Sequence, residues 1–164
     1  MPSIRRTQAI PLADRTPAAA LDEGALLSIV GYQLAQATVV TDRVFDEQVA
    51  RPQGLRQLEF TLLTLLLGNP GATARQLSRA LAVTPPHIAA AVDRLAQRGL
   101  LARQRGQSDA RMQHLTLTLA GSAAVDAAIA ALRHAEAEHL AGLSPAERAM
   151  LVELLHKAAR SRRT

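Results

Sequence analysis

The sequence has no cysteine, and aromatic residues make up only 2% of its 164 residues. Without thiols the chain cannot form disulfides, thiol nucleophiles, cysteine-based zinc sites or thiol redox sensors. Nothing in it requires an oxidising compartment, so a cytoplasmic location is expected. Because aromatics are scarce, the core must consist of Leu, Ala, Val and Ile, which suits packed helices. One domain is expected from a chain of this length.

Long apolar runs are absent as well. The longest extends from Leu62 to Leu67, broken by Thr64, and is far shorter than the ~20 residues of a membrane-spanning helix. Residues 1–17 contain early arginines without a following apolar stretch, and Pro11 and Pro17 interrupt them. This pattern predicts a loose N-terminal arm rather than an export signal. We therefore expect no membrane partner.

Excess positive charge is confined to about a quarter of the chain. Residues 70–112 contain seven basic and two acidic side chains, a surplus of five that equals the net charge of +5 of the whole chain. Binding of phosphate groups requires such a concentration of charge, although a merely solvated arginine-rich surface would have the same composition. The basic residues are Arg75, Arg79, Arg94, Arg98, Arg103, Arg105 and Arg111.

The spacing of apolar residues predicts long helices on both sides of this basic segment. An amphipathic helix is expected over about residues 21–48, opened by Asp22 and Glu23 at its positive end. A second helix over 55–67 is apolar on nearly every side and belongs in the centre of a fold. Two further helices are expected after the basic segment, at about 119–140 and at 144–160, where "SPAE" gives a capping signal.

The basic segment itself begins with two short helices. Thr73 and Gln76 have the spacing of a capping box, which predicts a helix of about two turns. After a tight connection, Thr84 is expected to cap another helix that ends at Gly99. Two short helices joined by so few residues form a helix-turn-helix. The buried stripe expected on the second helix is Ile88, Val92 and Leu95.

After the second helix the spacing of apolar residues changes from a helical period to that of a strand. Leu115, Leu117 and Leu119 alternate with two threonines, a two-residue period that predicts a strand with one buried face. A β-hairpin directly after a helix-turn-helix makes a winged helix, so the expected fold is mainly α with a small β-hairpin and long terminal helices. The hairpin is expected to consist of a strand at 100–104, a turn at 105–110 and a returning strand at 112–118.

The segment "LLARQRGQSDARMQHLTLTLAG" resembles the wing of the MarR-type bacterial regulators, with Asp109 and Arg111 at the family's Asp-x-Arg signature. "VDRLAQRGLLAR" is similar to the end of the family's recognition helix, and the resemblance is close over about residues 55–121. It implies a non-enzymatic transcriptional regulator, most simply a repressor, that binds a palindromic operator in double-stranded DNA as a homodimer. It also implies release from DNA by a small molecule, often a phenolic or other aromatic acid.

The resemblance implies roles for the wing residues. The family's wing arginine enters the minor groove and its wing aspartate holds that arginine, so Arg111 is the expected DNA contact and Asp109 its positioner, with Arg103 as a second partner. Alternatively, Asp109 and Arg111 only tie the hairpin together. The whole expected DNA-binding surface is Arg75, Thr84, Pro86, His87, Ala90, Arg94, Arg103, Arg105, Asp109 and Arg111.

The second helix of the helix-turn-helix departs from the family pattern. Residues 89–91, often polar or basic in relatives, are all alanine. Base reading is therefore expected to depend on Thr84, His87 and Arg94, or on apolar contact with thymine methyl groups. A different class of function stays open, in which the winged helix is a protein-interaction module whose basic face meets an acidic partner.

The resemblance also implies that the first helix and the last two helices intertwine in the dimer. The C-terminal helices have more apolar positions than a peripheral helix could bury on a small lobe: Val125, Ile129, Leu132, Leu140, Leu151, Val152, Leu154 and Leu155. The expected organisation is an arm (1–17), a dimerisation helix (18–50), a winged helix-turn-helix (51–118), C-terminal dimerisation helices (119–160) and a basic tail (161–164).

An effector cleft is expected where the dimerisation helices meet the winged lobe. Tyr32 and Gln36 on the first helix, with Phe60 and Thr64 on the second, are candidates to line it, and ordinary core packing explains these four residues equally well. No metal or cofactor is expected. His134 and His139 lie near two glutamates, but a spacing of five residues turns their imidazoles apart around a helix, so solvated side chains are the better interpretation.

Overall fold

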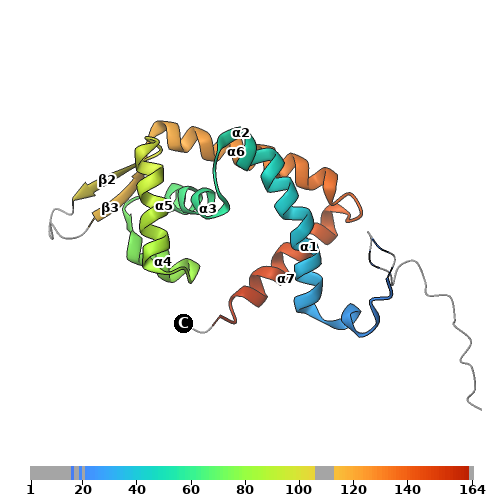
Figure 1. The fold of residues 1–164 in the computed structure, drawn as a ribbon. Helices are drawn as coiled ribbons and strands as arrows, with labels where there is room; N and C mark the ends of the chain where they lie inside the picture. The colour runs from blue at the N-terminus through green and yellow to red at the C-terminus, as the bar shows by residue number, and fades with distance from the viewer. Residues whose placement is uncertain (1–15, 17–18, 20, 106–112, 163–164) are drawn as a thin grey trace, which may run out of the picture. The chain divides into compact units, whose positions relative to one another are not determined.

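The computed structural model describes residues 16, 19, 21–105 and 113–162. Its contacts divide the chain into two units, Met1–Asp42 and Arg43–Thr164. Figure 1 shows a largely helical chain with one small sheet, in agreement with the expected fold class. In the part of the chain that the structure describes, no helix is long and apolar enough to cross a membrane.

The first unit contains the 3₁₀-helix η2 (Gly24–Ser28) and most of helix α1 (Val30–Phe45). The predicted start of a continuous helix at residue 21 is wrong. The carboxylate of Asp22 accepts a hydrogen bond from the N–H of Gly24 at 2.9 Å, and Gly24 has a left-handed φ of +52°. The backbone of Ile29 is extended. Helical backbone is therefore interrupted twice, at Gly24 and at Ile29, before α1 begins.

The first long helix continues beyond its predicted end. After α1 comes one turn of π-helix, η3 (Asp46–Ala50), and then α2 (Arg51–Gln53). Gly54, with a left-handed φ of +60°, ends this helix.

The remaining helices lie close to their predicted positions. They are α3 (Gln57–Gly68), α4 (Ala74–Leu81), α5 (Pro85–Gln97), α6 (Leu119–His139) and α7 (Pro145–Ala159). The capping box that starts α4 is confirmed, because Thr73 and Gln76 exchange hydrogen bonds between side chain and backbone. Ser144 and Glu147 form the second predicted capping box, at the start of α7. The helix-turn-helix of α4 and α5 follows from these local signals.

The sheet has one strand more than predicted. Strands β2 (Leu101–Arg105) and β3 (Gln113–Leu117) form the antiparallel hairpin, with Leu101 opposite Leu117. A third strand, β1 (Ala72–Thr73), pairs with the other edge of β3, giving the order β1-β3-β2. Two residues are too few to show a period, which is why the sequence pattern did not reveal β1.

The predicted alternation of buried leucines stops before Leu119. Leu115 is buried and Leu117 half-buried, whereas Leu119 is 92% exposed as the first residue of α6. The hydroxyl of Thr118 accepts a hydrogen bond from the N–H of Gly121 at 3.0 Å, so this threonine caps α6 and ends the strand.

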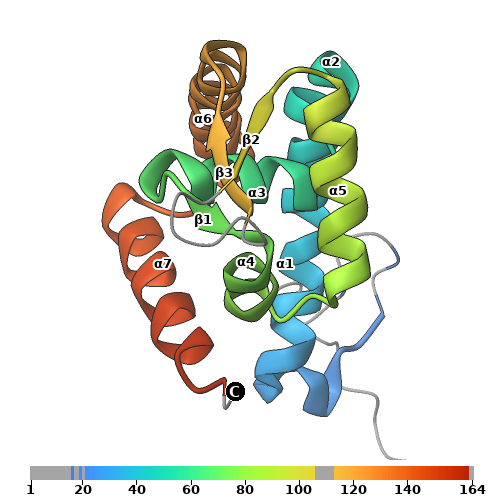
Figure 2. The same cartoon turned by 90° about the vertical axis from the view of Figure 1, so that its left-hand side faces the viewer.

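Helix α3 lies at the centre of the second unit, as its apolar sequence predicted. Its Leu62, Leu63 and Leu66 are buried, and α5, α6 and the sheet pack around it (Figure 2). Gly121 allows α6 to lie close to the backbone of Leu100, because a Cβ at Gly121 would collide with the carbonyl oxygen of Leu100. Three apolar residues of α6 that were assigned to a dimer interface instead pack against this core: Val125, Ile129 and Leu132.

Candidate nucleic-acid interface

The start of α5 presents short side chains on its exposed face, including Pro86, His87 and Ala90. Thr84 occupies the cap position, but the prediction that its hydroxyl caps the helix is wrong. The hydroxyl lies 3.2 Å from Nδ1 of His87 instead. Pro85 and Pro86 have no N–H groups, so the first two donors that a cap serves do not exist here. The next donor, the N–H of His87, bonds to the carbonyl of Thr84.

Arg94, in the second half of α5, has a partner inside the fold. Its Nε donates to Oε1 of Glu59 on α3 at 2.6 Å, and Glu59 is only 3% exposed. The same carboxylate accepts a hydrogen bond from the backbone N–H of Arg56 at 3.0 Å. Burial by itself would raise the pKa of Glu59, but these hydrogen bonds and the charges of both arginines lower it. Glu59 is thus a charged anchor that joins α5 to α3.

Arg98 fixes the end of α5 in a similar way. Its guanidinium donates to the carbonyl oxygens of Gly54 at 2.7 Å and Gln53 at 2.6 Å. These carbonyls belong to the end of α2, where a helix leaves acceptors unpaired. Arg98 therefore binds the end of one helix to the end of another, a role that the sequence pattern did not predict.

Arg103 joins the wing to the same helix. Its guanidinium forms an ion pair with Asp93 on the exposed side of α5. The sequence suggested Asp109 as its partner, but Asp109 and Arg111 lie outside the described residues. Arg105 ends β2, and its side chain also lies outside the described part. The described wing is thus anchored to α5 by Arg103, and three of the five basic residues of this segment whose side chains the structure describes have protein partners.

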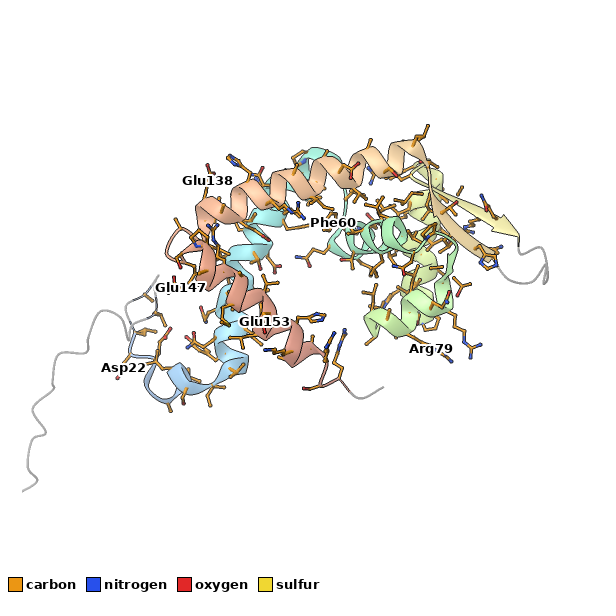
Figure 3. All side chains as sticks on the ribbon, turned by 180° about the vertical axis from the view of Figure 1, so that it is seen from behind. Asp22, Phe60, Arg79, Glu138, Glu147 and Glu153 are labelled. Carbon is orange, nitrogen blue, oxygen red and sulfur yellow. The ribbon has the colours of Figure 1, made fainter. Side chains whose placement is uncertain are left out.

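Two arginines on α4, Arg75 and Arg79, are exposed beside the sheet. Figure 3 shows Arg79 extending away from its helix. Between these arginines and the strands is an open hollow of about 680 Å³. It is lined by Gly71, Thr73, Ala74, Arg75, Gln76, Arg79, Gln113 and His114.

The four expected effector residues divide between the two units. In the first unit, the hydroxyl of Tyr32 donates to Glu23 at 3.0 Å, and Gln36 is exposed. Desolvation, aided by Glu23, raises the pKa of Tyr32. In the second unit, the ring of Phe60 packs on that of Phe45 with 5.8 Å between centroids. The hydroxyl of Thr64 donates to the carbonyl of Phe60, so these two residues are part of the packing of α3.

Histidines of α6 have local partners. His134 lies 3.4 Å from Glu138, and Nδ1 of His139 donates to the carbonyl of Ala135 at 2.9 Å. Among the described residues, no three His, Asp or Glu side chains are grouped so that they could hold a metal ion.

A β-hairpin wing directly after a helix-turn-helix, with an arginine-bearing exposed face, defines a winged-helix DNA-binding protein. The model of the MarR family matches residues 53–112. An HTH-type transcriptional repressor of Mycobacterium bovis is 33% identical over 106 residues, which cover 65% of this chain and 76% of that protein. The chain belongs to the MarR family of transcriptional regulators.

Solved structures agree with this assignment. The transcriptional repressor CouR of Rhodococcus jostii, bound to a 23-mer DNA duplex, is 31% identical and superposes with a TM-score of 0.77 over 85% of this chain and 98% of that one. A MarR family protein of Mycobacterium tuberculosis in complex with p-aminosalicylic acid is 29% identical, with a TM-score of 0.65 over 80% of this chain and 99% of that one. Both relatives have the same winged-helix fold as this chain.

Proposed function

We propose that this MarR-family regulator is a repressor that binds a palindromic operator as a homodimer. The observation that carries the proposal is the apolar surface of α7. No residue of this helix is buried, although five of its apolar side chains are between 38% and 68% exposed: Met150, Leu151, Val152, Leu154 and Leu155. Apolar surface of this extent is typical of an interface. A second copy of the chain would cover it and place two winged lobes about a two-fold axis.

The first helix supports the same arrangement. On α1, Val30, Leu34, Val39 and Val40 are between 36% and 70% exposed. We propose residues 18–50 and 119–160 as the dimerisation segments, and residues 51–118 as the DNA-binding domain between them. Such a protein would act in the bacterial cytoplasm, where the chromosome lies.

In the proposed complex the start of α5 enters the major groove and the wing enters the minor groove. The exposure of Thr84, Pro86, His87 and Ala90 supports the first contact. Arg111, positioned by Asp109, and Arg105 supply the second. Arg94 and Arg103 are engaged by Glu59 and Asp93, so we assign them to holding α5 and the wing in place. Base reading then depends on His87 and on apolar contacts with thymine methyl groups.

We propose an aromatic carboxylic acid as the effector. Two relatives support this class: the protein crystallised with p-aminosalicylic acid, and BpsR of Bordetella bronchiseptica, whose DNA binding is regulated by 6-hydroxynicotinic acid. For this ligand Tyr32 and Gln36 of the first unit stay predictions, and so, taken separately, do Phe60 and Thr64 of the second.

The experiment that tests the function is selection of binding sites from a random DNA library by the purified protein. The selected sites should contain two inverted half-sites separated by about one helical turn, or 10–10.5 base pairs. Light scattering of the complex should give two chains per site. Selection of single, asymmetric sites would contradict the dimer. Failure to retain any duplex would favour the alternative, an interaction module that binds an acidic protein.

A further inference from the structure

Helix α5 has an acidic side chain on its exposed face. Pro86, Ala90, Asp93 and Gln97 are spaced by three or four residues, so they lie on one face of the helix, and all four are exposed. Asp93 is the only acidic residue of this helix. In the proposed DNA-binding mode the helix lies in the major groove, whose two edges are rows of phosphates. A carboxylate on the exposed face would therefore meet groups of its own charge.

Arg103 of β2 neutralises this carboxylate. Its guanidinium forms an ion pair with Oδ1 of Asp93 and so connects α5 to the strand that leads into the wing. The side chain of Arg103 is 36% exposed and that of Asp93 is 56% exposed. Exposed ion pairs contribute little to the free energy of unfolding. Stability of the fold therefore does not account for an acidic residue at this position.

The other ion pair of α5 differs in its position. Arg94 is bound by Glu59, a carboxylate of α3 that is only 3% exposed, so this pair lies between two packed helices. The pair of Arg103 and Asp93 lies instead on the solvent side of α5. Arg103 alone would attract the phosphates of DNA of any sequence, and Asp93 alone would repel them. Together the two side chains have no net charge.

We propose that Asp93 is a specificity-determining residue, because it withholds the charge of Arg103 from DNA of unrelated sequence. The inference rests on the proposed DNA-binding function and deepens it. Sequence-independent binding depends on the number of phosphates that cationic side chains neutralise. Each chain loses one such contact when Asp93 occupies Arg103, so the affinity for unrelated DNA is lower.

The operator complex does not lose affinity in the same way. Two contacts must fit at once there, the start of α5 in the major groove and the wing in the minor groove. The pair of Arg103 and Asp93 holds the strand before the wing against α5, which fixes the two contacts relative to each other. Binding to unrelated DNA requires no such fit. The pair therefore raises the ratio of the affinity for the operator to the affinity for unrelated DNA, which is the measure of specificity.

Three variants test the proposal by changing the charge of the pair. Asp93→Asn leaves one positive charge, Arg103→Gln leaves one negative charge, and the double variant has no net charge, as in the wild type. Fluorescence anisotropy measures binding to a random-sequence duplex of ~30 base pairs, about three helical turns. In Asp93→Asn the salt slope, d log K/d log [salt], should be steeper by about 0.9 for each contact added. Arg103→Gln should bind more weakly than the wild type, and the double variant should bind like the wild type.

Binding to the selected operator gives the second readout. In Asp93→Asn the affinity for the operator should rise less than the affinity for the random duplex, because the wing is no longer held against α5. The ratio of the two affinities should fall about two- to fivefold, the range that an exposed ion pair supplies. Glu153→Gln on α7 is the matched control, because it also removes the carboxylate of an exposed ion pair, and it should leave both affinities unchanged.

Three results would overturn the inference while leaving DNA binding intact. Equal salt slopes for the wild type and Asp93→Asn would show that the released Arg103 reaches no phosphate. An unchanged affinity ratio in Asp93→Asn would show that the pair has no effect on specificity. A double variant that binds the random duplex as weakly as Arg103→Gln would show that Arg103 contacts DNA in the wild type. Absence of binding by the wild type to both duplexes would instead contradict the DNA-binding function itself.

Discussion

Helices α5 and α7 differ in what covers their apolar residues. α5 has 13 residues and buries Ile88, Ala91, Val92 and Leu95 within its own chain. α7 has 15 residues, five of which have large apolar side chains, and buries none of them. One helix is thus complete in a single chain, and the other has an uncovered face. The difference teaches that the winged lobe buries its own apolar residues, whereas the C-terminal helix leaves its apolar residues exposed, as the proposed dimer would require.

The same two helices also differ in the ion pairs that hold them. Arg94, Arg98 and Arg103 bind Glu59, the end of α2 and Asp93, and so hold α5 against the rest of its lobe. Among the residues that the structure describes, no equivalent long-range ion pair holds α7, whose ion pair joins Glu153 and Lys157 within the helix itself. Positive charge in this segment therefore positions α5 and is also proposed to bind phosphate, two uses that composition alone does not separate.

Among the changes considered, removal of α7 is expected to have the largest effect on folding and solubility. Deletion of residues 144–164 should remove part of the proposed dimer interface and leave an aggregating or unfolded chain, since obligate dimers often have no stable monomer. Light scattering and circular dichroism would measure this. A soluble, folded monomer after the deletion would show that α7 is dispensable and that the comparison with α5 has no functional meaning.

Salt should have the next largest effect, through the arginines of the basic segment that are proposed to contact DNA. If the dimer makes about 6–10 phosphate contacts, affinity for duplex DNA should fall about 10³- to 10⁵-fold between ~50 and ~200 mM salt. A titration by anisotropy gives the slope. A slope near zero would contradict phosphate binding by the basic segment and favour an acidic protein partner.

The ion pair between Glu59 and Arg94, which anchors α5, should contribute to the free energy of unfolding. Glu59→Ala removes a buried carboxylate and leaves Arg94 without its partner, which should cost about 2–3 kcal/mol of unfolding free energy after allowing for the partial exposure of Arg94. Glu153→Ala in α7 is the matched control, and loss of its exposed pair should cost less than about 0.5 kcal/mol. Equal losses measured by urea unfolding would remove the distinction between the two helices.

The pH dependence of the same anchor follows from its lowered pKa. Because the pKa of Glu59 is lower in the folded chain than its ordinary value, its contribution to stability is present above that ordinary value. The contribution is lost as the pH falls through the folded value. Glu59→Gln should therefore show a weaker decrease of unfolding free energy between about pH 6 and about pH 3 than the wild type. Parallel curves for the two proteins would contradict the ion pair.

The sequence predicted those parts of the fold that depend on neighbours along the chain. The caps at Thr73 and Ser144 involve residues at most a turn apart, so their patterns are visible in the sequence. β1 was missed because two residues carry no period. The start of α1 was misplaced because the left-handed backbone of Gly24 interrupts a pattern that remains helical in spacing.

The arrangement of the site depended on contacts that spacing does not encode. Arg94 and Glu59 are 35 residues apart, and Arg98 lies 44 and 45 residues from its two carbonyl acceptors. Such pairs form only when α3 and α5 have packed, so the sequence showed seven basic residues without showing which of them the fold engages. The hydrogen bond of His114 to Gly71, 43 residues away, was hidden for the same reason.

The smallest expected effect is a loss of operator affinity on substitution in the wing, measured against a substitution at the end of α7. Arg111→Ala deletes the proposed minor-groove side chain but leaves the described strands and Leu115 unchanged, so fold and dimer should persist. Operator binding should weaken by about 1–2 kcal/mol, mostly where the minor groove is narrow and rich in A·T pairs. Arg160→Ala, at the end of α7, should change little.

Substitution of Asp109, the proposed positioner of Arg111, tests the same DNA contact. Asp109→Ala should weaken binding less than Arg111→Ala, because it only frees that arginine to move. The double variant should cost less than the sum of the two single losses, since both act through one contact. Anisotropy with the selected operator would measure all four proteins. If Arg111→Ala binds like the wild type while Arg160→Ala does not, the DNA contact lies at the end of α7, and the wing serves only to support α5 through Arg103.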